Sequence, residues 1–177
     1  MARLREQGKV RFIGFSEMFT VDPQHEVAAL ALRTAPELWD FVMLKYGILN
    51  QYAAKEVLPL AQRCKVGIIN MAAVRIKLPD PVLLERLIAN WKVRGVIPTD
   101  SLSVGNPLGW LVRDNVESII GAGYKFAADH PAISTVLTGT ADMIHLEQNV
   151  AAMDQPYLPR EDKERLVALF GDIAEYS

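Results

Sequence analysis

Short apolar runs alternate with longer stretches of helical character along the whole chain. Four runs have the length and the Val, Ile, Leu, Phe and Met content of buried strands: residues 10–15, 39–46, 66–74 and 133–138. The third run is almost unbroken in its apolar character, which is typical of a strand with both sheet faces covered. Strands that alternate with helices are joined by right-handed crossovers and lie parallel. The pattern therefore predicts an α/β fold with one parallel sheet.

Helices are predicted between and after these strands from their start and stop signals. They cover residues 2–7, 22–33, 51–64, 80–94, 114–129, 141–153 and 159–170. Asp22-Pro23 combines an N-cap with a proline at the first helical position, and Gly8 is a common helix stop. Pro59 predicts a kink inside its helix. Residues 96–108 contain two prolines and a glycine, so we expect a loop and an inserted segment there.

The chain holds four strand-helix units, whereas a closed (β/α)8 barrel requires eight. Its 177 residues are enough for one domain, 1–177, and fewer than the roughly 250 residues of a typical closed barrel. We therefore expect an open half-barrel with helices on its convex side and a bare concave face. Unpaired edge strands and an exposed apolar face drive association, so we expect a homodimer or else poor solubility.

Composition narrows the classes of function. Half of the residues are hydrophobic and 23% are charged, as in globular proteins. The formal charge of -2 argues against a nucleic-acid partner, which requires a basic face. No apolar run reaches the roughly 18 residues of a membrane span, and the charged start lacks a leader-peptide core. Cys64 is the only cysteine, which indicates a reducing compartment. We expect a cytoplasmic protein without a metal site or a membrane partner.

Three strings at the ends of predicted strands carry a family resemblance. They are GKVRFIGFSE at 8–17, DFVMLKYGIL at 40–49, and VLTGTA at 136–141 followed by LEQN at 146–149. In this order they resemble the aldo-keto reductase family over essentially the whole chain. The resemblance implies a (β/α)8 barrel that reduces aldehydes or ketones with NADPH or NADH. It places this chain at strands five to eight, the C-terminal half of the barrel.

The resemblance also implies that the chain has no catalytic residue. The family's catalytic Asp, Tyr, Lys and His lie on the first four strands, which this chain lacks. His25, His130 and His145 do not follow a strand in the manner of the family's histidine. Lys45 and Tyr46 are neighbours in a predicted strand, so they point to opposite faces and cannot share one site. We expect no carbonyl reduction by this chain alone.

Four residues match the family's nicotinamide contacts. The resemblance implies that Ser16 hydrogen-bonds the carboxamide, while Glu17 stands where the family usually has Asn. Met43 replaces a Gln that also binds the carboxamide, and a thioether is only a weak acceptor. Met71 stands where an aromatic ring often stacks on the nicotinamide, a face that a thioether can still cover. Alternatively, Ser16 and Glu17 begin an exposed loop, and the methionines fill the core.

Five further residues match the phosphate and adenosine end of the cofactor. Gly139 and Thr140 precede the helix at 141, where free N–H groups and the helix dipole suit a phosphate. His145 replaces the Arg that holds the 2′-phosphate, and imidazole holds a phosphate less firmly than guanidinium. The choice between NADP and NAD therefore stays open. Asn149 matches the adenine-side Asn. Arg75 faces the pyrophosphate or forms a surface ion pair, and Thr140 is alternatively an ordinary residue before a helix.

Two functions remain open from the sequence. In the first, the chain is a member or fragment of an NAD(P)H-dependent aldo-keto reductase that retains the cofactor half. A complementing N-terminal half would then complete the barrel and admit a small carbonyl substrate. In the second, it is a non-catalytic half-barrel that binds a nucleotide or self-associates. The reading frame upstream of Met1 distinguishes them, because the first function requires strands one to four from elsewhere.

Overall fold

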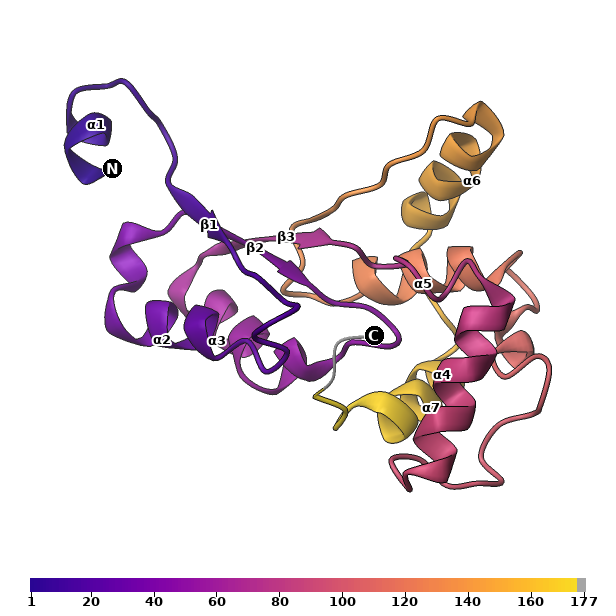
Figure 1. Ribbon diagram of the computed structural model, residues 1–177. Helices are drawn as coiled ribbons and strands as arrows, with labels where there is room; N and C mark the ends of the chain where they lie inside the picture. The colour runs from indigo at the N-terminus through magenta and orange to yellow at the C-terminus, as the bar shows by residue number, and fades with distance from the viewer. Residues whose placement is uncertain (175–177) are drawn as a thin grey trace.

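The computed structural model describes residues 1–174 and contains one parallel sheet with its helices (Figure 1). The strands are Gly14–Ser16 (β1), Phe41–Lys45 (β2), Gly67–Met71 (β3) and Thr135–Val136 (β4). The α-helices are Ala2–Glu6 (α1), Glu26–Thr34 (α2), Val57–Cys64 (α3), Pro81–Val93 (α4), Ile119–Ala128 (α5), Met143–Asp154 (α6) and Arg160–Phe170 (α7). Single 3-10 turns lie at Pro36–Leu38 (η1), Tyr52–Lys55 (η2) and Gly109–Leu111 (η3).

The four strands lie side by side in chain order, β1-β2-β3-β4, and every pair is parallel. This order confirms the alternating pattern of the sequence, since each strand returns to its neighbour through a crossover. β1 and β4 are the two edges, and they do not pair with each other within residues 1–174. The sheet is therefore open.

The first strand is shorter than the run of apolar residues predicts. Pairing with β2 starts only at Gly14, so the predicted strand at 10–15 was wrong for residues 10–13. Asp40 replaces the missing ladder there: its carboxylate accepts the Ile13 N–H at 2.7 Å, and its own N–H donates to the Ile13 carbonyl at 2.7 Å. One side chain thus anchors the approach to β1, and the residues before Ile13 form no strand.

The two faces of the sheet differ in their cover. Val42, Leu44 and Ile68 point to the face on which α2 and α3 pack, and all three are completely buried. Figure 1 shows these two helices side by side beneath the strands. The other face carries Met43 and Ile69, which stand opposite each other in the parallel register and are only half-buried. Within residues 1–174, one face of the parallel sheet is consequently left without a helical layer.

Several helices begin later than their sequence signals predict. α2 begins at Glu26, yet the Asp22 carboxylate still accepts the N–H groups of Glu26 and Val27 at 3.0 and 2.9 Å. The predicted helix at 114–129 begins at Ile119, because the Ser118 hydroxyl caps it. The predicted helix at 51–64 is divided into η2 and α3. Pro59 therefore lies in the first turn of α3, where its missing N–H costs nothing, and not at a kink.

The segment between α4 and α5 is a loop with several buried apolar side chains. Ile97, Leu102, Leu108 and Leu111 are buried together with Trp91 of α4. The predicted loop at 96–108 is confirmed, and its apolar side chains attach it to the main core. This packing supports α4 and α7 beside the sheet.

Asn70 ties the end of β2 to β3 through its buried side chain. Its amide Oδ1 accepts the Tyr46 N–H at 2.8 Å, and its Nδ2 donates to the Tyr46 carbonyl at 2.8 Å. The side chain has no exposed surface. These two hydrogen bonds extend the pairing of β2 with β3 by one residue, because the backbone pairing ends at Lys45 opposite Met71.

Replacing Asn70 by Leu is expected to lower the free energy of unfolding by about 3 kcal/mol, because it leaves the buried N–H and C=O of Tyr46 without partners. Urea unfolding followed by circular dichroism measures this loss. The matched control is Asn90→Leu at an exposed position of α4, for which we expect a change below about 0.5 kcal/mol. Equal effects of both substitutions would contradict the proposed role of Asn70.

Candidate functional site

The carboxyl ends of the strands bring together part of the predicted nicotinamide group. The parallel register places Ser16 beside Met43, and it places Met71 opposite Lys45 on the same face. Ser16 is exposed, and the two methionines are half-buried. All three side chains therefore lie on the uncovered face, which is where a ligand at the mouth of a barrel would have to contact them.

Glu17 turns away from this face into the protein. Its Oε1 accepts the Lys45 N–H at 2.8 Å, and its Oε2 lies 2.6 Å from His25 Nδ1. Both side chains of the Glu17–His25 pair are almost fully buried. The carboxylate thus links β1, β2 and the start of α2, and it is engaged inside the fold.

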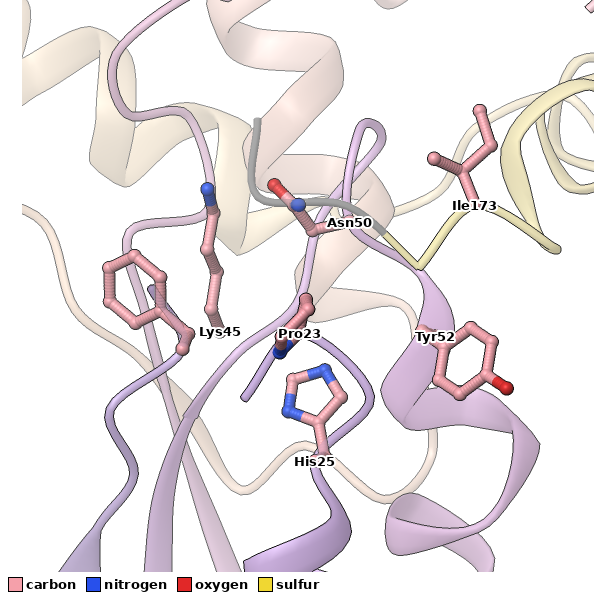
Figure 2. A pocket seen from close by; sticks show the side chains of 7 residues that line it. Pro23, His25, Lys45, Asn50, Tyr52 and Ile173 are labelled. Carbon is pink, nitrogen blue, oxygen red and sulfur yellow. The ribbon is translucent and has the colours of Figure 1, made fainter. Parts of the chain in front are cut away.

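A small cavity lies beside this buried pair, and Figure 2 shows its lining. His25 and Lys45 line it together with Tyr52 and Ile173. Its volume, about 10 Å³, is suited to a single water and is far below the size of a cofactor ring. The cavity therefore belongs to the packing around Glu17 and does not form a ligand site.

Lys45 is buried at the end of β2, with only 4% of its surface exposed. Its ammonium group lies over the ring of Phe19, 5.1 Å from the centroid. Burial lowers the pKa of Lys45 to about 8, and the like charges of Lys77 and Arg75 act in the same direction. Tyr46 points to the opposite face, where it stacks on Phe126. The predicted separation of Lys45 and Tyr46 is thus confirmed.

A second, larger cavity gathers the predicted adenosine and phosphate residues. Gly139, Thr140, His145 and Asn149 all line one space of about 340 Å³ between α5, α6 and the segment after β3. Arg75 does not line it, although its neighbour Val74 does. Gln148, next to Asn149, also lines it, and residues more distant in sequence complete the lining: Pro79, Ser118, Ile120, Gly121 and Tyr124. The structure therefore brings four of the five residues together.

A hydrogen-bond network fixes the wall of this cavity. The Thr138 hydroxyl lies 2.9 Å from the Tyr124 hydroxyl and accepts from Asn149 Nδ2 at 2.8 Å. Asn149 is buried, so this bond sets the orientation of its amide and of α6 against α5. Thr138 and Tyr124 were not among the site residues predicted from the sequence. The signal available for Thr138 was its place directly after an apolar run, at the functional end of a strand.

Close packing at Gly123 positions α5 against the segment after β3. A side chain at this position would meet Val74 and Leu78, each within 2.7 Å of an added Cβ. The glycine thus lets α5 approach closely enough to close one side of the cavity. Its role is in packing, as expected for a glycine inside a helix and not after a strand.

The start of α6 is already occupied by a carboxylate. Asp142 caps the helix and accepts the N–H groups of Ile144 and His145 at 2.8 and 3.2 Å. These hydrogen bonds hold the pKa of Asp142 below its usual value, so the group is ionised at neutral pH. The N–H groups that were expected to be free for a phosphate are therefore engaged. A phosphate at this position would also face a fixed negative charge.

The two groups of predicted ligands lie in different parts of the molecule. The cavity that contains Thr140 and Asn149 is not lined by Ser16, Met43 or Met71. A cofactor would have to extend from this cavity, around the end of β3, to the uncovered face.

No helix within residues 1–174 is long and apolar enough to cross a membrane.

Comparisons with a family model and with solved structures point to the same family. The model of the aldo/keto reductase family matches residues 1–169. Among solved structures, the chain is similar to apo aldo-keto reductase AKR11C1 from Bacillus halodurans, with a TM-score of 0.63 and 19% identity, covering 99% of this chain and 56% of that one. It is also similar to the thermostable aldo-keto reductase Tm1743, crystallised with the inhibitor epalrestat, with a TM-score of 0.58 and 17% identity, covering 95% and 52%. The chain thus spans about half the length of these structures. No curated protein sequence matches it.

Burial of Lys45 predicts an unusual pH dependence of stability. Its folded pKa of about 8 lies below the unfolded value near 10.4, so between these values the unfolded state binds the additional proton. Stability attributable to this group therefore rises with pH, by about 2 kcal/mol from pH 8 to pH 10. Urea unfolding across this range measures it.

Lys45→Met should remove this rise, and Lys9→Met at an exposed position should leave it intact. A rise that persists in Lys45→Met would assign the effect to another group.

Proposed function

Because the chain belongs to the aldo/keto reductase family, we propose that it is the cofactor-binding half of an NAD(P)H-dependent carbonyl reductase. Its four strands would correspond to strands five to eight of the family's barrel. Three observations support this assignment: the parallel order of the strands, the order of the family strings along the chain, and coverage of about half of the similar structures.

The observation that carries the proposal is the shared cavity of Gly139, Thr140, His145 and Asn149. Residues that the family resemblance implies for one end of a dinucleotide line one space in the fold. Its volume of about 340 Å³ is within the range of small-molecule sites. We infer that this cavity holds the adenosine end of the cofactor.

The chemistry of the lining fits adenosine better than a phosphate. Ile120 and Val74 offer apolar surface to a base, and Gln148 offers an amide for hydrogen bonds. No Lys or Arg is among the described lining residues, and Asp142 adds a negative charge at the start of α6. We therefore propose weak dinucleotide binding with little preference for the 2′-phosphate of NADP.

The nicotinamide end would reach the uncovered face at Ser16, Met43 and Met71. When bound, the cofactor supplies a hydride for a carbonyl carbon. Ser16 could donate a hydrogen bond to the carboxamide, and the methionines could cover the ring by apolar contact. None of these groups can protonate a carbonyl oxygen, and general acid catalysis contributes roughly 10²–10⁴-fold to such reactions. We propose that a carbonyl substrate is reduced only if another polypeptide supplies the acid.

The second candidate function is a non-catalytic module that self-associates. The specific observation in its favour is the exposed apolar side chain next to each edge strand, Phe12 at 66% exposure before β1 and Leu137 at 46% exposure after β4. The two functions would use neighbouring surfaces, since Leu137 lies next to Gly139 and Thr140, which line the cavity.

Supplying a cation at the cavity should create selectivity for NADPH. His145 is exposed and stands where the family resemblance places an Arg. We expect His145→Arg to tighten NADPH binding about tenfold, through a charge-assisted hydrogen bond to the 2′-phosphate, and to change NADH binding less than about twofold. Fluorescence titration with both cofactors measures this.

The matched control is His145→Gln, which supplies no charge and should leave the NADPH-to-NADH ratio unchanged. Equal tightening of both cofactors in His145→Arg would place the 2′-phosphate away from residue 145. Absence of any binding to either variant would overturn the cavity assignment.

The purified chain should oxidise neither NADPH nor NADH with a panel of simple aldehydes above background, because no residue is placed to donate the proton. Loss of absorbance of the reduced cofactor measures turnover. Turnover that disappears in a Thr140→Ala, Asn149→Ala double variant would show that this chain contains a complete site.

A further inference from the structure

We propose that a cavity between η2, α7 and the turn after α5 binds a small aromatic carboxylate. Lys163 would hold the carboxylate, and the wall that contains Tyr46 would cover the aromatic ring. The cavity has a volume of about 490 Å³, within the range of small-molecule sites. None of its described lining residues is among those that the family resemblance implies for the cofactor. This inference therefore does not depend on cofactor binding.

Three segments that are distant in sequence form the cavity. Ala54 belongs to η2, and His130 and Pro131 lie in the turn after α5. Lys163 and Val167 lie one turn apart on α7. Because these segments meet only in the folded chain, no local pattern in the sequence indicates this site.

The buried amide of Gln51 fixes two of these segments relative to each other. Its Nε2 donates to the Ile48 carbonyl at 2.9 Å and to the Leu166 carbonyl of α7 at 3.0 Å. Only 2% of Gln51 is exposed. The start of η2 is thus held against α7 before a ligand arrives, which lowers the entropy cost of binding.

The wall of the cavity offers aromatic and apolar surface. Tyr46 stacks on Phe126 with 5.5 Å between the ring centroids. The ring of His130 meets Tyr46 edge-on, at 5.2 Å and an interplanar angle of 71°. Pro131 and Val167 add apolar surface to the same cavity. Rings pack favourably against such a wall in offset or edge-to-face geometry, which favours an aromatic body for the ligand.

His130 supplies a hydrogen-bond donor without a charge. Its Nδ1 accepts the Ala132 N–H at 3.2 Å, so the neutral ring carries its proton on Nε2. Burial lowers the pKa of His130, and the positive charge of Lys163 acts in the same direction against the opposing effect of Asp129. The imidazole is therefore mostly neutral at pH 7, and the charge that selects an anion must come from elsewhere.

Lys163 provides that charge. Its Nζ donates to Asp129 Oδ2 at 2.5 Å, and its side chain is 33% exposed. An ammonium group has three N–H donors, and this ion pair uses one of them. Asp129 is not among the described lining residues, whereas Lys163 is. A second cation, Lys55, lines the cavity and pairs with Asp172. The described lining thus carries two ammonium groups and one carboxylate, which favours an anionic ligand.

Naphthoate and its uncharged amide, naphthamide, test the site because they share a ring system and differ in charge. Ligand-observed NMR titration at neutral pH should show naphthoate binding at least about tenfold more tightly than naphthamide, through a charge-assisted hydrogen bond. Lys163→Met should reduce the affinity for naphthoate about tenfold and leave the affinity for naphthamide unchanged. Unchanged binding of naphthamide also shows that the variant is folded.

The matched control is Arg160→Met, which removes another cation of α7 that pairs with a carboxylate, Glu164, and that does not line the cavity. It should leave both affinities unchanged. A second variant, Val167→Trp, fills the cavity from an exposed position of α7. It should weaken the binding of both compounds at least about tenfold, while circular dichroism shows an unchanged fold.

Three results would overturn the proposal: no binding of naphthoate, equal affinities for naphthoate and naphthamide, or equal effects of Lys163→Met and Arg160→Met. Binding of naphthoate that is lost in the Thr140→Ala, Asn149→Ala double variant and kept in Lys163→Met would place the compound between α5 and α6 and also reject this site.

Discussion

A parallel sheet requires cover on both faces, and this requirement governs the rest of the molecule. α2 and α3 bury one face through Val42, Leu44 and Ile68, while the opposite face has no helical layer within the described chain. Burial of apolar surface contributes roughly 25 cal/mol per Å² to the free energy of folding, so the sheet lacks this stabilisation on its uncovered face. The open edges of β1 and β4 add unpaired backbone groups to it. The proposed association surface and the proposed path of a dinucleotide both depend on this one-sided sheet.

Buried polar side chains stabilise the carboxyl ends of the strands, where the open sheet would otherwise fray. Asn70 pairs with both backbone groups of Tyr46, and Glu17 joins the Lys45 N–H to His25. In a closed barrel this rim is the functional end. Here two of its polar groups are directed inward, so they stabilise the sheet and do not face a ligand. The position that the family resemblance gives to Glu17 is thus used for structure.

The cavity between α5 and α6 is lined by four of the residues that the family resemblance implies for the cofactor. Its shape depends on the Tyr124–Thr138–Asn149 network and on the close approach at Gly123. The charge near the cavity is unfavourable for a phosphate, because the Asp142 carboxylate occupies the helix N-terminus that would otherwise attract one. A site can therefore keep the geometry for an adenosine while its preference for a charged group is weakened.

The sequence alone determined the order and type of the elements and the parallel arrangement, because alternating apolar runs and helix caps are local signals. The family resemblance implied a cofactor role for Gly139, Thr140, His145 and Asn149, and these four residues line one cavity in the fold. Only the tertiary structure decided how much of each apolar run pairs. Ile13 is anchored by Asp40, 27 positions away, and not by a ladder. It also decided that Glu17 turns inward, because its partners His25 and Lys45 come from other elements and their distances depend on packing. Local patterns carry no information on such long-range contacts, which form only when the whole chain is folded.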